Sequence, residues 1–192
     1  MRKRFECQLQ LGRTAIEKIQ IPLKSRDELP PILAGLQWMF LTPEVNEAVF
    51  QLLEKKVQGN KQDTGRPGMD LWHILVLGVT RLGLDCDFDR LEHHANYDVL
   101  LREILGIPSL SEGGRSFHQK TLSQNVCMVD DELLTQINAI VVRFGRQEFK
   151  KKKTKRSPLR PIAMSWKRTS ISQLTLIFYG MQDASVSNSL AD

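Results

Sequence analysis

The stretch that decides the fold is residues 71–83, which read LWHILVLGVTRLG. Its apolar residues recur at spacings of three and four, which places them on one face of an α-helix. The stripe consists of Leu71, Ile74, Leu75, Gly78, Val79 and Leu82. Gly83 is suited to end the helix. Because the stripe runs over three turns, the segment predicts a helix against which its neighbours pack.

Further helices are predicted on both sides of this one. Asp27 and Thr42 are cap residues, and each is followed by proline in the first turn of a helix. After residue 83, helices are expected over 87–94, 98–105 and 119–125, and from Asp130 onward. The expected core includes Leu71, Leu75, Leu82, Leu91 and Leu101. The fold class is therefore mainly α, and the helical domain spans residues 27–149.

Residues 1–26 have a different pattern. Apolar and polar residues alternate from Phe5 to Leu11 and again from Ile19 to Leu23, which is the period of a strand. Two short β-strands and an extended arm both agree with it, so the prediction is a short extended or β N-terminal arm.

The C-terminal quarter divides into two parts. Residues 150–160 form a basic linker, in which Lys150–Lys153, Lys155 and Arg156 put six cations into seven residues. From Ser157 on no clean period continues, and residues 161–192 are expected to form a disordered tail.

Composition bounds the class of protein. The chain has 192 residues, 41% of them hydrophobic, and a formal net charge of +5. No apolar run approaches the length of a membrane span, and no apolar segment follows the basic N-terminus. The three cysteines are scattered, which favours reduced thiols. We therefore expect a cytoplasmic protein without a membrane partner.

Several segments partly match motifs that carry chemistry. Asp85, Asp87 and Asp89 imitate the start of a calcium loop, but Arg90 and Asn96 stand where glycine and glutamate are needed. His93 and His94 point about 100° apart on a helix and do not chelate one metal together. Surface or core-edge positions are the better interpretation of the histidines. No phosphate loop or nucleophile motif occurs. We therefore expect no catalytic residues and no metal site.

The excess charge leaves two interpretations open. The basic run is either a solvated tail or a set of contacts to DNA phosphates, which release counterions when neutralised. Residues 69–106 are either a plain three-helix packing or a helix-turn-helix unit, with Arg102 as the outward cation of the third helix.

Four segments together resemble a known family. They are residues 21–31 (IPLKSRDELPP), 65–72 (GRPGMDLW), 82–91 (LGLDCDFDRL) and 101–106 (LREILG). They resemble the N-terminal region of bacterial insertion-sequence transposases whose catalytic domain carries an Asp-Asp-Glu triad. The resemblance runs from about Phe5 to about Lys153 and implies a helical module that binds DNA at transposon ends. It adds Arg66 to the residues expected to contact DNA, beside Arg102 and the basic run.

The resemblance also implies a ribonuclease-H-like domain after the basic run, with a strand carrying the first metal-binding aspartate. That strand is missing here. Codons permitted for residues 161–182, read in a shifted frame, give a peptide that resembles it. We interpret residues 161–192 as out-of-frame translation after a frameshift near Arg160.

The expected function follows from these points. The chain is interpreted as a truncated transposase that keeps its DNA-binding module and lacks the catalytic domain for transposition. It is then not an enzyme and needs no cofactor, although the parent family uses Mg²⁺. The alternative is an interaction or inhibitor protein that pairs with full-length transposase or with itself, or a non-functional pseudogene product.

Overall fold

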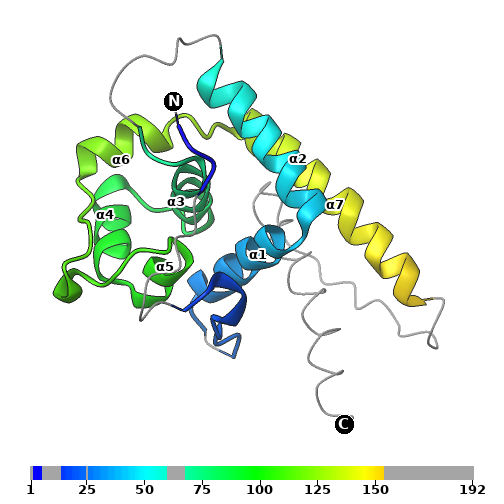
Figure 1. Cartoon of the computed structure of the whole chain (residues 1–192), viewed down its shortest axis with the longest axis horizontal. Helices are drawn as coiled ribbons and strands as arrows, with labels where there is room; N and C mark the ends of the chain where they lie inside the picture. Colours follow the sequence, from blue (N-terminus) through cyan, green and yellow to red (C-terminus); the bar gives the residue numbers. More distant parts are fainter. Residues whose placement is uncertain (1, 6–13, 25, 60–67, 154–192) are drawn as a thin grey trace.

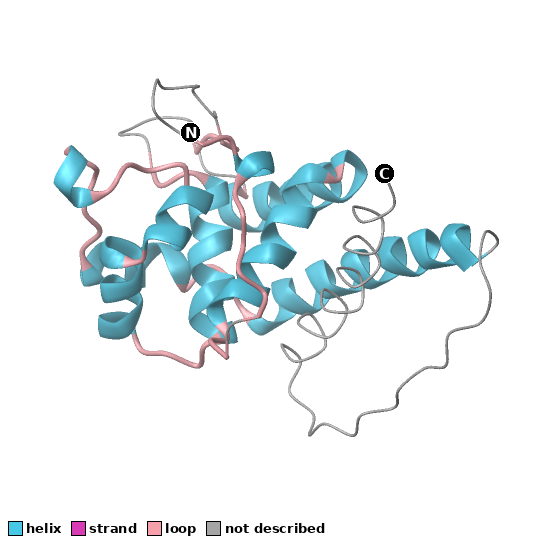
Figure 2. Ribbon diagram, turned by 90° about the horizontal axis from the view of Figure 1, so that it is seen from below, coloured by secondary structure: helices cyan, strands magenta, loops and turns pink. Residues whose placement is uncertain are grey.

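The structure, a computed structural model, describes residues 2–5, 14–24, 26–59 and 68–153, without the side chains of Gln58 and residues 146–153. Helices make up its regular structure, and no strand occurs within these ranges (Figures 1 and 2). The α-helices are α1 (Leu29–Leu41), α2 (Pro43–Leu53), α3 (Leu71–Gly83), α4 (Phe88–Tyr97), α5 (Val99–Ile104), α6 (Gln119–Val126) and α7 (Asp131–Lys153). Short turns are η1 (Ile16–Lys18), the π-helical η2 (Glu54–Gln58) and η3 (Leu110–Glu112). The prediction of a mainly helical chain is confirmed.

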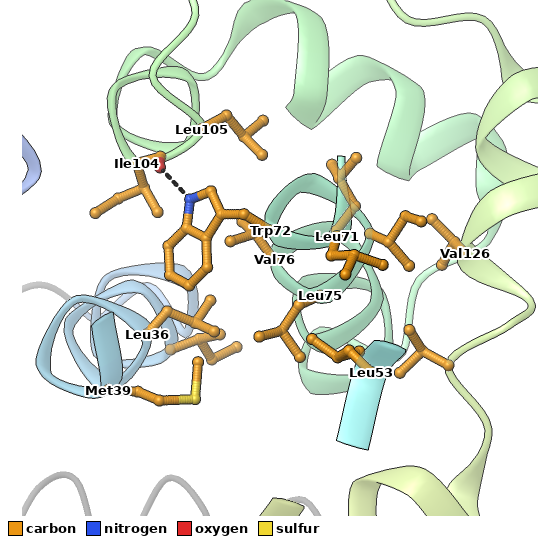
Figure 3. Close-up of a cluster of buried hydrophobic side chains, with 14 of the residues drawn as sticks. Leu36, Met39, Leu53, Leu71, Trp72, Leu75, Val76, Ile104, Leu105 and Val126 are labelled. Atoms are coloured by element: carbon orange, nitrogen blue, oxygen red, sulfur yellow. Dashed lines mark hydrogen bonds between the residues drawn. The ribbon is translucent and has the colours of Figure 1, made fainter. Parts of the chain in front are cut away.

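Helix α3 lies at the centre, as its sequence predicts. Eight consecutive residues, Leu71–Gly78, are buried, so the helix is enclosed on nearly all sides at this level. Trp72 fills the space between α3, α1 and α5, and its indole nitrogen donates a hydrogen bond of 2.9 Å to the carbonyl of Ile104 (Figure 3). Leu36 and Met39 of α1 face the same cluster. Of the five core leucines predicted, four are buried, but Leu82 near the end of α3 is only half-buried.

Helix α1 packs on one side of α3, α2 packs on α1, and α7 packs on α2. Glu28, not Asp27, occupies the cap position of α1 and forms no side-chain cap hydrogen bond. The Asp27 carboxylate, one residue earlier, accepts the amide of Leu29 at 3.2 Å. Thr42 occupies the cap position of α2, but its hydroxyl donates back to the carbonyl of Trp38 at 2.9 Å, so it ends α1 instead of capping α2. The Lys56 ammonium lies 2.7 Å from Asp130, directly before α7. This ion pair joins the end of α2 and η2 to the start of α7, so the two helices run antiparallel (Figure 1).

Helices α4, α5 and α6 cover the other side. Asp87 and Asp98 cap α4 and α5 by accepting the amides of Arg90 and Leu101, each at 2.8 Å. The acidic residues around Asp85 thus include a helix cap, which is the interpretation preferred over a calcium loop. Asp130 accepts the amide of Leu133 at 2.9 Å and caps α7 in the same way.

The expected N-terminal arm differs from the structure. Ile19–Leu23 forms no strand, and Ile16–Lys18 before it is a 3-10 turn with Ile16 and Ile19 buried. The first expected strand falls mostly on residues 6–13, which lie outside the described residues. The alternation of apolar residues was misleading because a short segment that buries two isoleucines against a helical core gives the same pattern.

Residues 2–5 instead cap the central helix. The carbonyls of Lys3 and Arg4 accept the amides of Leu71 and Trp72 at 2.9 and 3.0 Å. These amides belong to the first turn of α3, where a helix has no partners of its own. The N-terminal residues thereby supply hydrogen-bond acceptors to the first turn of α3.

Candidate nucleic-acid interface

The basic run begins inside a helix. Lys150–Lys153 form the last turn of α7, so the first four residues of the predicted basic linker are helical. Figures 1 and 2 show this end of α7 projecting beyond the body of the molecule. Lysines in a last helical turn interact favourably with the negative end of the helix dipole. Lys155, Arg156 and Arg66, together with the predicted tail, lie outside the described residues.

Arg102 is not the outward cation that the sequence predicted. Only 2% of its surface is exposed. Its guanidinium donates to the carbonyls of Ala95 and Arg115 at 2.8 and 3.0 Å, and to that of Pro108 through two nitrogens, Nε at 2.8 Å and Nη2. Burial lowers the pKa of Arg102 below its ordinary value. The helical spacing placed Arg102 on the outer face of α5, but the loop after α5 folds back and covers that face.

Helices α3 and α4 follow one another across a short turn and pack together. The turn between them, residues 84–87, contains Asp85 with a φ of 46°, the left-handed conformation that aspartate tolerates better than most residues. The amides of Leu84 and Cys86 bond back to the carbonyls of Thr80 and Arg81 at 3.0 and 3.1 Å. The guanidinium of Arg81 lies over the ring of Phe88, 4.4 Å from its centroid. These contacts fix the direction in which α4 leaves α3.

The buried side of α4 is tied to its surroundings. Leu91 and Ala95 are fully buried. The amide side chain of Asn96 donates to the carbonyl of Phe117 and accepts its N–H, both at 2.8 Å. This pair of hydrogen bonds holds the segment before α6 against α4. Helix α4 is therefore a rigid support for whatever its outer face carries.

That outer face carries a cation and aromatic rings. Arg90, His93 and Tyr97 are exposed and fall within about 60° of one another around α4. Tyr97 is 66% exposed, and its ring centroid lies 5.0 Å from that of His93. Val99, directly after α4, is 65% exposed. Within the described part of the chain, no carboxylate forms an ion pair with Arg90. This face was not predicted from the sequence, although the amphipathic pattern of residues 88–97 contains it.

The acidic residues at and within α4 form hydrogen bonds to helix starts. Glu92 accepts the amide of Gln119 at 2.7 Å, and Asp89 accepts the side-chain amide of the same residue at 2.6 Å. Asp87 is engaged with the first turn of its own helix. These three carboxylates thus accept amides at the starts of α4 and α6, while Asp87 and Asp89 remain exposed.

The N-terminal arginines are also engaged within the protein. Arg4 bonds to Glu47 and Glu54 of the α2–η2 segment, with shortest distances of 2.6 Å to each. Arg2 donates to Asn125 at 2.6 Å and to the carbonyl of Met69 at 3.2 Å. The carboxylates of Glu47 and Glu54 raise the pKa of Arg4 above its ordinary value. These cations hold the fold together and are a poor choice for binding phosphate.

The histidines differ among themselves. His93 and His118 are exposed and His94 is half-buried, as expected for surface or core-edge positions. His73 is buried in α3, where its Nε2 lies 2.9 Å from the carbonyl of Leu105. Its partner atom is a carbonyl, which only accepts, so Nε2 carries the proton. No cluster of three or more metal-binding side chains occurs in the described ranges.

Comparisons with protein-family models, with curated proteins and with solved structures find no match for this chain. Among the helices that the structure describes, none combines the length and the apolar character that crossing a bilayer requires.

Proposed function

We propose that this chain is a DNA-binding module of the transposase type, which holds double-stranded DNA and does not itself cut it. The observation that carries the proposal is the basic run, residues 150–156. Its first four lysines close a 23-residue helix whose end projects from the body (Figure 1). A projecting cationic helix end can approach a phosphate backbone without a steric clash.

The resemblance of residues 5–153 to transposase N-terminal regions supports the same class of partner. The hydrogen bonds and ion pairs that other arginines form within the protein support it as well. Because Arg2, Arg4 and Arg102 serve the fold, the phosphate contacts are assigned to the basic run. The proposal includes no catalytic step, since the resemblance ends before the segment that would bear the catalytic triad.

The test is the salt dependence of DNA binding by the full chain. We expect the logarithm of the affinity for a short fluorescent duplex to fall linearly with the logarithm of salt concentration. Replacing all six cations of the run with glutamine should flatten this slope by about four to five units. Fluorescence anisotropy at several KCl concentrations measures it.

A matched pair of triple variants serves as the control. Lys151, Lys152 and Lys153 are changed to glutamine in one, and Lys18, Lys24 and Arg26, which are all exposed, in the other. The first should lose about two to three units of slope and the second less than about one. Equal losses would show that only net charge matters, and an absence of binding by the unchanged protein would refute the proposal.

A further inference from the structure

We propose that the DNA contact of the basic run extends back along the outer face of α7 to Arg143 and Arg146, two cations that the run does not include. This inference rests on the proposed function and defines the surface on which the phosphate backbone of duplex DNA lies. It is carried by the register of the cations on α7, the exposure of Arg143 and the packing of the helix on α2.

The register of α7 places its cations on one face. Four of them recur at intervals of three or four residues over about 15 Å of helix, namely Arg143, Arg146, Lys150 and Lys153. Because each residue of an α-helix is turned by about 100° from the one before it, these four positions fall within about 80° of one another. Glu148, the one carboxylate of α7 after its first turn, lies about 140° round the helix from Arg143. The four positions therefore form a continuous line of positive charge.

The part of this face that the structure describes is open to solvent. By the same register Thr135, Gln136 and Ala139 lie on it before Arg143, and all three are exposed. Arg143 is exposed as well, and its guanidinium lies 5.7 Å from the ring centroid of Phe144. Among the described residues no carboxylate forms an ion pair with Arg143. Its charge is thus accessible to a ligand without the breaking of an ion pair.

The neighbouring helix α2 brings one more carboxylate to this end of α7. The pair of Lys56 and Asp130 sets the antiparallel register of the two helices, and counting from it brings Glu44 near the level of Arg143. Glu44 is exposed and is not paired with Arg143 in the described part of the chain. With Glu148 it makes two carboxylates against the six cations of residues 143–153, so this end of the helix remains positive.

The line of cations is unfavourable for a helix that has no ligand. Like charges four residues apart repel one another, and Arg146 and Lys150 have this spacing. A solvated helix face normally mixes cations with carboxylates at intervals of three and four. Around Arg143 these positions are Ala139, Ile140, Arg146 and Gln147, none of which is acidic. A phosphate backbone placed along this face would supply the negative charge that the helix itself lacks.

The packing of α7 favours a nucleic acid over an anionic membrane as the occupant. A helix that binds a bilayer surface inserts its apolar face. The apolar face of α7 is not available, because Leu133, Leu134, Ile137 and Val141 are buried in the core. What remains is a row of cations, which suits contacts to phosphate that carry no sequence information. An acidic protein would meet the same charges, and the experiment separates it from DNA.

The experiment measures the salt dependence of duplex DNA binding by the full chain, using fluorescence anisotropy. Arg143→Gln and Arg146→Gln should each flatten the slope of log affinity against log salt by about one unit, and the double variant by about two. Arg143→Lys keeps the charge and should retain the slope. Because phosphate contacts do not read bases, the loss should be the same for duplexes of unrelated sequence.

Arg115 provides a matched control. Like Arg143 it is exposed, and its guanidinium lies 6.0 Å from the ring centroid of a phenylalanine, Phe117. Helix α6, which it precedes, lies on the other side of the body from the projecting end of α7 (Figure 1). Arg115→Gln changes the net charge by the same amount and should flatten the slope by less than about half a unit.

A second variant guards against a loss of folding in α7. Circular dichroism and thermal melting check that each glutamine variant folds as the unchanged protein does. Ala139→Glu keeps every cation and places a carboxylate one turn before Arg143, at an exposed position of the same face. It should flatten the slope as well, because it pairs with Arg143 and repels phosphate.

The outcomes separate this inference from the proposed function. A salt slope that depends on Lys150–Lys153, but no more on Arg143 than on Arg115, overturns the extension along α7 and leaves the proposed function standing. Absence of DNA binding overturns both. If Arg143→Gln weakens binding to polyglutamate or to phosphatidylserine vesicles and leaves DNA binding unchanged, the face belongs to an acidic protein or to a membrane, and either result refutes our inference.

Discussion

At the scale of single residues, Arg102 shows how a buried cation is accommodated without a carboxylate. Its guanidinium donors end on backbone carbonyls, one of which belongs to Ala95 in the last turn of α4. Carbonyls in a last turn have no partner within their helix and carry the negative end of its dipole. The charge therefore lies in a favourable field, and the side chain joins α4, α5 and the loop before α6.

This arrangement predicts that Arg102 matters for stability and that its loss has no selective effect on DNA binding. Arg102→Met removes the donors and leaves the carbonyls of Ala95, Pro108 and Arg115 without these hydrogen bonds. We expect the free energy of unfolding to fall by about 2–4 kcal/mol, measured by urea denaturation. Arg115→Met, at an exposed position, should change it by less than about 0.5 kcal/mol. A loss in Arg102→Met no larger than that of the control would contradict the role assigned here.

At the scale of elements, the helix starts are what the sequence predicts best. Asp98 and Asp130 both cap helices, because a cap depends only on residues about three positions away. Leu82 is less buried than predicted, and Thr42 bonds back to α1 instead of capping α2. Both depend on how neighbouring elements pack. Of the site, only the basic charge could be predicted. Arg102 is buried by the segment 105–118, which connects α5 to α6. The outer face of α4 can be identified only when the elements that pack on α4 are known. Short-range patterns do not contain those contacts.

Helix α3 also contains a group, His73, whose protonation should change the stability of the whole fold. Desolvation is the main cause that lowers the pKa of His73, with a smaller contribution from Arg115. The carbonyl of Leu105 and the carboxylate of Asp70, 3.8 Å from Nδ1, act in the opposite direction. The folded protein therefore binds a proton at His73 less readily than the unfolded chain.

The sign of the pH dependence follows. Below the unfolded pKa of about 6.5 the unfolded chain binds more protons, so stability falls as the pH is lowered toward the pKa of the folded state. The slope from this one group is at most about 1.4 kcal/mol per pH unit. Urea denaturation at a series of pH values from neutral to mildly acidic measures it.

His73→Gln keeps a donor for the carbonyl of Leu105 but does not titrate. We expect it to flatten the pH dependence of unfolding in this range, whereas His118→Gln, at an exposed position, should leave it unchanged. Contacts to Arg4 and Lys56 lower the pKa values of Glu47 and Asp130. The stability that these carboxylates contribute is therefore lost only at a lower pH, outside the range in which His73 acts. An unaltered slope in His73→Gln would show that His73 is not the group responsible.

At the scale of the whole molecule, residues 2–5 connect its two sides. Arg4 reaches the α2–η2 segment, Arg2 reaches α6, and the backbone between them caps α3. Phe5 packs among the rings of Phe40, Trp72 and His73, with centroids 5.8–6.2 Å away. A Cβ added at Gly106 would lie 2.9 Å from the ring of Phe5, so the glycine makes room for it. Two kinds of contact, ionic and apolar, thus hold one segment.

The ion pairs of Arg4 and the aromatic contacts of Phe5 differ in how much they should contribute to the stability of the fold. The side chain of Arg4 is 41% exposed, and ion pairs in that situation are screened by water and salt. Phe5 is half-buried and carries aromatic contacts that salt does not weaken. We therefore expect Phe5→Ala to lower the free energy of unfolding by about 2–3 kcal/mol, below the full cost of truncating a buried phenylalanine. Arg4→Gln should cost less, and its cost should shrink further at high salt.

Urea denaturation at low and high salt distinguishes these expectations, with Tyr97→Ala as the matched aromatic control. Tyr97 is largely exposed, so its removal should change stability by less than about 0.5 kcal/mol. If Phe5→Ala behaves like this control while Arg4→Gln is the more harmful change, the segment is held by charge. Its hold on the two sides of the molecule would then depend on ionic strength, as DNA binding by the basic run is proposed to do. If Phe5→Ala is the more harmful, as we expect, the fold keeps its N-terminal connection at the salt concentrations that release DNA.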